Sequence, residues 1–343
     1  MRFIKYIGSK RKLIQHVLDA IGQQNKVLDL FSGSGVVAYQ LCKRGAIVHA
    51  NDISPYSYHI NKTYLESDDT SEEVFNELNS CDKPNVEYFA KYYSQNPNAS
   101  KERIFFTREN GLIIDAVSER AFGDLSQYKS SILCELIYRM SICANTSGIF
   151  KSFHKNIAGR ERFEGSAVQK HNYAKRQVLT RIKLEKPIVP KGPIGMAFQY
   201  EANEFFDKVQ DNYDVVYLDP PYNIHQYSGN YHLLEQVCRP VSERYIPTDK
   251  QISGIQPDLY KSSYCNNKKC FKTFSDLLDK IADKTKKIVI SYNSNGYISK
   301  NDMINLLNEK FNDVSIKEIK YCNFTGGPKQ SGAVTEFIFI AHN

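Results

Sequence analysis

Short apolar runs, each closed by polar or turn residues, predict the strands of a sheet at both ends of the chain. Five of them are typical of buried strands: 26–30, 46–51, 194–200, 214–218 and 287–291. A helical spacing of apolar residues over 36–44 separates the first two, which predicts a βαβ unit. Two more runs, 314–321 and 335–341, leave no room for a long helix between them, so we expect an antiparallel pair.

The strand pattern stops between Asn61 and Lys191. Apolar residues at helical spacing over 110–120 and 130–143 predict a mainly helical region, followed by a basic and loop-like stretch. Prolines and glycines between 187 and 195 then mark the return to strands. The pattern predicts an α/β fold in which residues 1–63 and 193–343 form a sheet domain and residues 64–192 are inserted into it.

The composition is that of a globular protein. The chain is 41% hydrophobic and 24% charged, and its apolar runs are shorter than a membrane helix requires. The first residues are too briefly apolar for a signal peptide and are interrupted by Lys5. We therefore expect a cytoplasmic protein without a membrane partner, whose eight scattered cysteines are reduced thiols and hold no metal.

The positive charge is concentrated in one segment. The net charge is +7, but residues 139–191 alone hold twelve Lys or Arg against three Glu, and residues 66–82 hold seven acidic residues and no basic one. A polyanion such as a nucleic acid is the partner that the basic segment favours, and a solvated cationic face is the alternative.

A glycine-rich loop follows the first strand and opens the first helix. It reads Asp29-Leu-Phe-Ser-Gly33-Ser-Gly35, and Asp52 ends the second strand, where a carboxylate can bind ribose hydroxyls. The spacing also fits a nicotinamide dinucleotide or a turn that binds nothing. Asp29 would repel a pyrophosphate, however, and favours a cationic ligand such as S-adenosylmethionine, beside the aromatic and basic groups of Tyr6 and Lys10.

A second motif, Asp219-Pro220-Pro221-Tyr222, follows the strand that ends at Leu218. The prolines fix an extended backbone and remove two amide donors, so that carbonyl oxygens remain as acceptors. A carboxylate with a rigid carbonyl can accept both hydrogens of an exocyclic amine, and Tyr222 offers a face for stacking a base. The alternative interpretation is a proline turn that merely caps the strand.

The order of these motifs resembles the Dam-like class of DNA adenine-N6 methyltransferases, and the continuation Asn223-Ile-His-Gln-Tyr227-Ser-Gly-Asn-Tyr231-His-Leu-Leu-Glu235 is similar to FokI-type modification methylases. The resemblance implies a Rossmann-like class I methyltransferase sheet, mostly parallel with an antiparallel last strand, and a helical insertion that recognises the target. It also implies S-adenosylmethionine, duplex DNA with a flipped-out adenine, and a cognate restriction endonuclease that is not stably bound.

Carried onto this sequence, the resemblance implies catalytic roles for Asp219, Pro220, Pro221 and Tyr222. It implies cofactor contacts by Tyr6, Lys10, Asp29, Phe31, Gly33, Gly35, Asp52, Ile53, Asn203 and Asp219. Asn203 is a departure, because Dam-like enzymes usually carry a Gly-Asp pair where this chain has Tyr200-Glu201-Ala202-Asn203.

The expected DNA contacts lie in the basic insertion and behind the catalytic motif: Lys151, Lys155, Arg160, Arg162, Lys175, Arg176, Tyr227 and Tyr231. Basic groups would contact phosphates, while groups such as Asn145, Asn156 or Arg160 could read base edges. An RNA base methyltransferase and a non-catalytic DNA-binding protein remain as alternatives.

Overall fold

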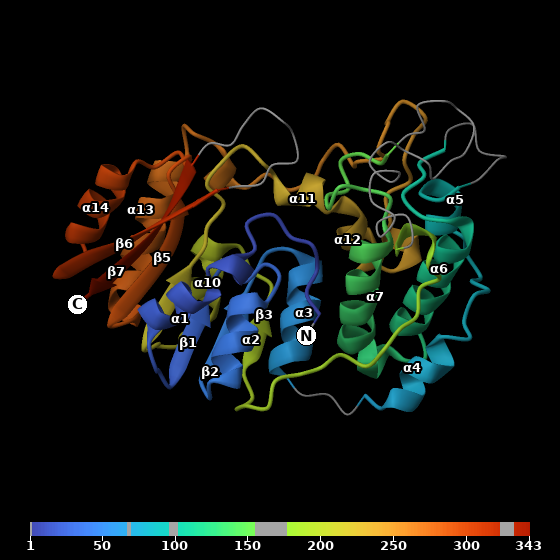
Figure 1. Ribbon diagram of the computed structural model, residues 1–343, viewed down its shortest axis with the longest axis horizontal. Helices are drawn as coiled ribbons and strands as arrows, with labels where there is room; N and C mark the ends of the chain where they lie inside the picture. Colours follow the sequence, from blue (N-terminus) through green and yellow to red (C-terminus); the bar gives the residue numbers. More distant parts are fainter. Residues whose placement is uncertain (1, 67–69, 96–101, 155–176, 323–332) are drawn as a thin grey trace.

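The computed structural model describes residues 2–66, 70–95, 102–154, 177–322 and 333–343. Its sheet has seven strands in the order β3-β2-β1-β4-β5-β7-β6 (Figure 1). The parallel strands are β1 (Lys26–Asp29), β2 (Ile47–Asn51), β3 (Met196–Phe198), β4 (Val215–Leu218) and β5 (Lys287–Asn293). The antiparallel strands are β6 (Asp313–Cys322) and β7 (Ala333–His342). The predicted Rossmann-like sheet with its antiparallel end is confirmed.

Helices cover both faces of the sheet because successive strand residues point to opposite sides. Val27 packs on one face with the core of α1 (Ile14–Ile21) and α2 (Val36–Lys43), whereas Leu28 packs on the other with α13 (Cys270–Ile281) and α14 (Lys300–Asn308). The short helix α10 (Phe205–Lys208) lies on this second face. The strand order reverses between β1 and β4, and ligands of such sheets bind at the carboxyl ends of the strands flanking that point.

The helical part of the chain lies beside the sheet, at the right of Figure 1. It contains α4 (Glu72–Leu78), α5 (Phe89–Tyr92), α6 (Arg108–Phe122) and α7 (Lys129–Cys143), while α3 (Pro55–Leu65) lies between it and the sheet. No helix in the described ranges has the length and apolar character needed to cross a membrane.

Two short helices that follow the Asp-Pro-Pro-Tyr motif connect the sheet to the helical part. They are α11 (Tyr227–Asn230) and α12 (His232–Val237), and Leu233 and Leu234 of α12 share one buried core with Leu136 of α7. The boundaries at 64 and 192 stay a prediction. The buried core of the helical part, however, includes α12, which the sequence prediction assigned to the C-terminal segment of the sheet domain.

The loop after α12 is held against the helical part by two buried arginines. Arg103 donates to the carbonyls of Thr248 and Gln251, and Arg244 faces Asp115 at 3.5 Å. These contacts hold the first part of the loop that follows α12. The loop continues to residues 256–260, which reach the site described next.

Candidate functional site

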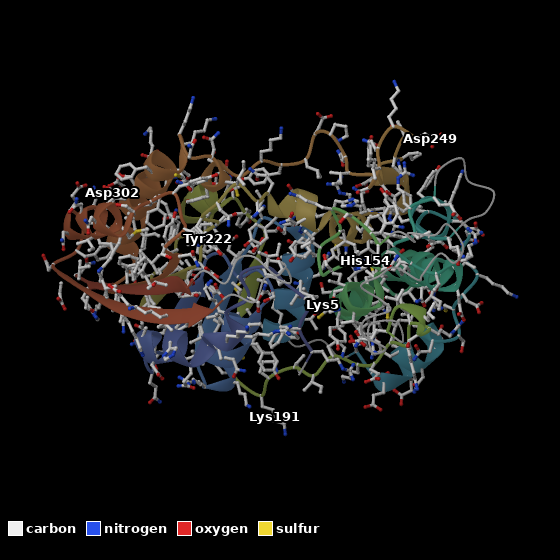
Figure 2. The ribbon with its side chains drawn as sticks, turned by 45° about the horizontal axis from the view of Figure 1, so that its top comes forward. Lys5, His154, Lys191, Tyr222, Asp249 and Asp302 are labelled. Carbon is white, nitrogen blue, oxygen red and sulfur yellow. The ribbon has the colours of Figure 1, made fainter. Side chains whose placement is uncertain are left out.

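A cavity of about 460 Å³ opens at the carboxyl ends of β1 and β4. Asp29 of β1 and Asp219 after β4 both line it, because the two strands are hydrogen-bonded neighbours with Asp29 in register with Tyr217. In Figure 2, Tyr222 lies over the sheet and His154 over the helical part, with Lys5 between them in that view. The cavity therefore brings together the two motifs that sequence analysis had found separately.

Gly33 is required at the floor of the cavity. Its φ is +48°, and an added Cβ would lie 2.8 Å from Cε1 of Tyr6. The Tyr6 ring itself stacks on Tyr231, with centroids 5.0 Å apart and planes 16° apart. The N-terminal segment thus lies directly over the glycine loop, and both line the cavity as expected.

Gly35 has a role in helix packing. It does not line the cavity, although its φ of +73° does require glycine at the start of α2. An added Cβ would lie 3.1 Å from Asn61 Oδ1 and 3.2 Å from Ile60 Cγ2. This glycine allows α2 to start close against α3, and the cofactor contact at Gly35 stays a prediction.

Asp29 is a buried carboxylate whose negative charge is only partly compensated by its neighbours. Its side chain is 1% exposed, and neither oxygen makes a geometrically good hydrogen bond within the described chain. Burial raises the pKa of Asp29 well above its usual range, and Asp219 and Asp52 add to this, while the Ala38 amide and Lys10 offset a part. A cationic ligand in the cavity would relieve this, which fits the sulfonium and ammonium of S-adenosylmethionine.

Asp52 holds the glycine loop from the tip of β2. Its Oδ2 accepts from the Gly33 amide at 2.8 Å, and its Oδ1 accepts from the Ser54 amide at 2.8 Å. Each oxygen keeps a second lone pair, so the carboxylate can also accept from ribose hydroxyls. Ile53 and Phe31 line the cavity beside it, and Phe31 meets the ring of Tyr264 edge-on.

Asn203 lies outside the cavity wall. Its Nδ2 donates to the Thr273 carbonyl at 2.9 Å, and its Oδ1 accepts from the Tyr264 hydroxyl, so both ends of the amide are used inside the protein. The wall is formed instead by the preceding residues Tyr200, Glu201 and Ala202. The expected contact of Asn203 with the cofactor is therefore wrong, and the 200–202 stretch is the part of the motif that faces the ligand space.

Asp219 forms a buried ion pair with Lys10. The distance from Lys10 Nζ to Asp219 Oδ1 is 2.7 Å, and Glu336 Oε1 lies 3.2 Å from the same nitrogen. Burial lowers the pKa of Lys10, but the two carboxylates more than offset it and the pKa stands well above its ordinary value. Lys10 lines the cavity and its ammonium is directed to the catalytic motif, while its contact with the cofactor stays a prediction.

The rest of the Asp-Pro-Pro-Tyr motif is clamped to the sheet. Pro220, Pro221 and Tyr222 line the cavity, and the Tyr222 carbonyl accepts from the Tyr297 amide at 3.1 Å. The Tyr222 ring meets Tyr292 of β5 edge-on, with centroids 6.0 Å apart. The loop is thus fixed before any ligand binds, which suits a site that works by positioning.

The expected DNA contacts divide into three groups. Tyr227 lines the cavity and Lys151 is exposed. Tyr231 is 0% exposed behind Tyr6, and its hydroxyl accepts from the Ile7 amide at 2.7 Å, so the prediction that it contacts DNA is wrong. The others lie outside the described residues: Lys155, Asn156, Arg160, Arg162, Lys175 and Arg176.

Asn145 is a structural residue. It is 0% exposed, and its Nδ2 donates to the carbonyls of Ile104 and His154, at 3.0 and 2.9 Å. The suggestion that Asn145 reads a base edge is therefore wrong, because the amide holds the start of the basic segment to the helical part.

Two acidic residues at the site were not predicted. Glu235 of α12 lines the cavity. Burial raises its pKa to about 7; the positive charge of Arg239 lowers the pKa and the negative charge of Asp52 raises it. Glu336 of β7 lies behind Lys10. Glu235 stands in the continuation quoted for the resemblance, but a carboxylate in a short helix of mixed polar and apolar residues gives no sign of which cavity it faces.

Comparison with known proteins agrees with these features. The sequence model of the family described as D12 class N6 adenine-specific DNA methyltransferase matches residues 6–321. The type II methyltransferase M.NlaIII of Neisseria lactamica is 27% identical and covers 94% of this chain and 92% of that protein. M.CviAII of Paramecium bursaria Chlorella virus 1 is 26% identical, over 90% of this chain and 89% of that protein. M.FokI of Planomicrobium okeanokoites is 27% identical over 89% of this chain but only 46% of its own length.

Proposed function

Since the chain belongs to the D12 class of N6 adenine-specific DNA methyltransferases, whose methyl donor is S-adenosylmethionine, we propose that the adenine reacts at Asp219 in the cavity between β1 and β4. The observation that carries this proposal is the shared cavity: the glycine loop and the Asp-Pro-Pro-Tyr motif line one space. The nicotinamide enzyme and the non-catalytic DNA-binding protein, which the sequence had left open, do not fit this family.

The chain's own residues divide the binding of S-adenosylmethionine among them. Asp52 would accept from the ribose hydroxyls, the Gly33 backbone would lie against the ligand, and Asp29 would face its positive charge. When bound, S-adenosylmethionine supplies a methyl group on a sulfonium. Tyr6 and Phe31 supply apolar wall on either side of the glycine loop.

Asp219 accepts a hydrogen bond from the N6 amine of the target adenine. The nitrogen lone pair of that amine is delocalised into the ring, and hydrogen bonds to Asp219 and to a carbonyl of the rigid proline loop favour a tetrahedral nitrogen whose lone pair can react. N6 forms a bond to the methyl carbon as the bond from that carbon to the sulfonium sulfur breaks, which leaves a neutral thioether, and the proton that N6 gives up passes to solvent by way of the Asp219 carboxylate. Catalysis is positioning together with charge stabilisation, which suits a loop held at Tyr222 by β5.

The target adenine must leave the duplex to reach Asp219, because its amine is enclosed by stacked bases and the motif lies inside a cavity. Tyr222 offers a stacking face for the extruded base, and Tyr227 lines the cavity beside it. The basic segment 139–191 supplies positive charge for duplex phosphates. Among the basic residues of this segment that we expect to contact DNA, the structure describes Lys151, and its side chain is exposed.

The biological role that we propose is the modification half of a restriction-modification system. The relatives M.NlaIII and M.CviAII carry the name of type II methyltransferases and match this chain over about nine-tenths of their length. A cognate endonuclease would then cut the same sequence without forming a stable complex with this chain. The sequence holds one Asp-Pro-Pro-Tyr motif, so a single catalytic site is expected.

The experiment is to map methylated bases in a host that lacks its own adenine methylation. Expression of the wild type should give N6-methyladenine within one short recurring DNA sequence, whereas Asp219→Ala, expressed at the same level and for the same time, should leave most of these sites unmethylated. Asp276→Ala, on the exposed face of α13, is the matched control and should methylate like the wild type. Methyl groups in RNA but not in DNA, or adenine methylation by Asp219→Ala to the wild-type extent, would refute the proposal.

A further inference from the structure

β7 carries a carboxylate, Glu336, inside the sheet. Its side chain is 2% exposed, and the apolar residues Phe337, Ile338 and Phe339 follow it along the strand. Its Oε2 accepts from Nδ2 of Asn293, its register partner on β5, at 3.2 Å. An ionised carboxylate is rarely buried without a positive partner, because desolvation is costly. The partner is Lys10.

Lys10 lies between Glu336 and Asp219. Its Nζ is 3.2 Å from Glu336 Oε1 and 2.7 Å from Asp219 Oδ1, and it donates to the Gly8 carbonyl at 3.2 Å. The side-chain exposure rises along this row, from 2% at Glu336 through 6% at Lys10 to 21% at Asp219. The row therefore runs from the interior of the sheet to the cavity, and Asp219 is its accessible end.

Glu336 acts on Lys10 through its charge. Its Oε1 is at ion-pair distance from Nζ but makes no hydrogen bond of good geometry within the described chain. With Asp219 ionised, two negative charges share one positive charge, and the row keeps one net negative charge. Without the charge of Glu336, Lys10 and Asp219 would form a neutral pair, whose carboxylate is a weaker hydrogen-bond acceptor.

We propose that Glu336 is a positioning residue for methyl transfer: it shares the charge of Lys10 and so leaves Asp219 a strong acceptor for the target amine. The inference rests on the proposed role of Asp219. Glu336 does not line the cavity and would touch neither adenine nor cofactor.

The charged surroundings of Asp219 set the direction of the expected effect. Burial raises the pKa of Asp219 to about 6; Lys10 lowers it, and Glu336 raises it again. The other ionisable side chains that interact with Asp219 are Asp29, Tyr217 and Tyr227. Removal of the Glu336 charge should therefore lower the pKa of Asp219 and move the acid limb of the pH profile to lower pH.

The test compares Glu336→Gln with Glu318→Gln in single-turnover methylation of DNA that carries the mapped site. Glu318 lies on the neighbouring strand β6, but its side chain is 45% exposed and pairs with Lys300 at 2.6 Å, so it is a matched control. Glu336→Gln should bind S-adenosylmethionine and DNA within about twofold of the wild type. Its rate should fall on the order of tenfold, with the acid limb shifted to lower pH. Glu318→Gln should change neither.

Glu336→Asp keeps the negative charge but shortens the side chain by one methylene, which moves the charge away from Lys10. Its rate and its acid limb should therefore both lie between those of the wild type and those of Glu336→Gln. A wild-type rate in Glu336→Gln, or the same shifted limb in both variants, overturns the inference. If Glu336→Gln does not fold, Glu336→Asp decides: a wild-type rate and acid limb overturn the inference, and a reduced rate with the limb shifted to lower pH, at wild-type cofactor affinity, supports it.

Failure of this inference is distinct from failure of the proposed function. If Asp219→Ala methylates far more slowly than the wild type, while Glu336→Gln behaves like the wild type, only the role of Glu336 is wrong. If Asp219→Ala methylates at the wild-type rate, the assignment of the catalytic motif is wrong.

Discussion

The ring of Tyr231 stacks on Tyr6 at a centroid distance of 5.0 Å, and this pair joins the chain that follows the catalytic motif to the N-terminal segment above the glycine loop. The Tyr231 hydroxyl also accepts from the Ile7 amide at 2.7 Å. The pair therefore couples the position of the cofactor loop to that of the catalytic loop through packing inside the protein.

Tyr231→Phe should lower stability without affecting the DNA surface. The change leaves the partly buried Ile7 amide without its acceptor, which should lower the free energy of unfolding by about 0.5 to 1.5 kcal/mol. Chemical denaturation measures this loss, and the salt dependence of DNA binding should stay that of the wild type. Tyr227→Phe is the control, since its hydroxyl makes only a 3.4 Å contact with the Ile7 carbonyl and should cost less. A reduced salt dependence in Tyr231→Phe would return this residue to the DNA interface.

Gly33→Ala should weaken cofactor binding more than its backbone strain alone explains. Alanine at positive φ costs about 1 to 2 kcal/mol, and here its Cβ would also collide with Tyr6. Gly45→Ala is matched, because Gly45 has a φ of +93° but nothing within 4 Å of an added Cβ. Calorimetry should show S-adenosylmethionine affinity reduced at least tenfold in Gly33→Ala and unchanged in Gly45→Ala. Equal losses in both variants would show that the contact with Tyr6 is unimportant.

The fold could be predicted because its signals are local. Alternation of strand side chains between two apolar faces, as at Val27 and Leu28, and a helical spacing between the first two strands are visible in short windows of sequence. The missing helix between the last two strands predicted their antiparallel pairing, and β6 and β7 are paired in that way.

The errors at the site concern which face of an element a residue occupies. Tyr231 and Tyr227 lie in one short polar and aromatic stretch, yet one packs behind Tyr6 and the other lines the cavity. Asn203 stands next to the wall residue Ala202 but points its amide toward Thr273. Glu336 reaches Lys10 only because β7 inserts between β5 and β6, an order that no local pattern specifies.

The pH dependence of methyl transfer should show an acid limb from Asp219. Its pKa is raised by burial to about 6, so the carboxylate is ionised and can accept from the amine above that pH and is protonated below it. Single-turnover rates at saturating cofactor and DNA should therefore be constant above about pH 7 and fall as the pH drops through 6. Asp219→Asn has no carboxyl to titrate, and its residual rate should lack this limb. The same limb in Asp219→Asn would assign it to another group.

Asp219→Ala and Tyr222→Ala should affect different steps of the reaction. Asp219→Ala removes the acceptor of the target amine, so the rate at which bound cofactor and DNA react should fall on the order of a hundredfold or more, as when one preorganised hydrogen-bond partner is deleted. Because the substitution also leaves Lys10 with Glu336 alone, Asp219→Asn is needed beside it to separate a lost charge from a lost contact.

Tyr222→Ala removes a stacking face that β5 supports through Tyr292, and loss of base stacking costs about 1 to 3 kcal/mol. The loss should appear as weaker capture of the extruded adenine, so that more enzyme is needed for half-maximal rate while the rate at saturation falls less than in Asp219→Ala. Single-turnover methylation over a range of enzyme concentrations distinguishes the two patterns. A near wild-type rate at saturation in both Asp219→Ala and Asp219→Asn would mean that the motif is a proline turn and that the acceptor of the amine lies elsewhere in the cavity.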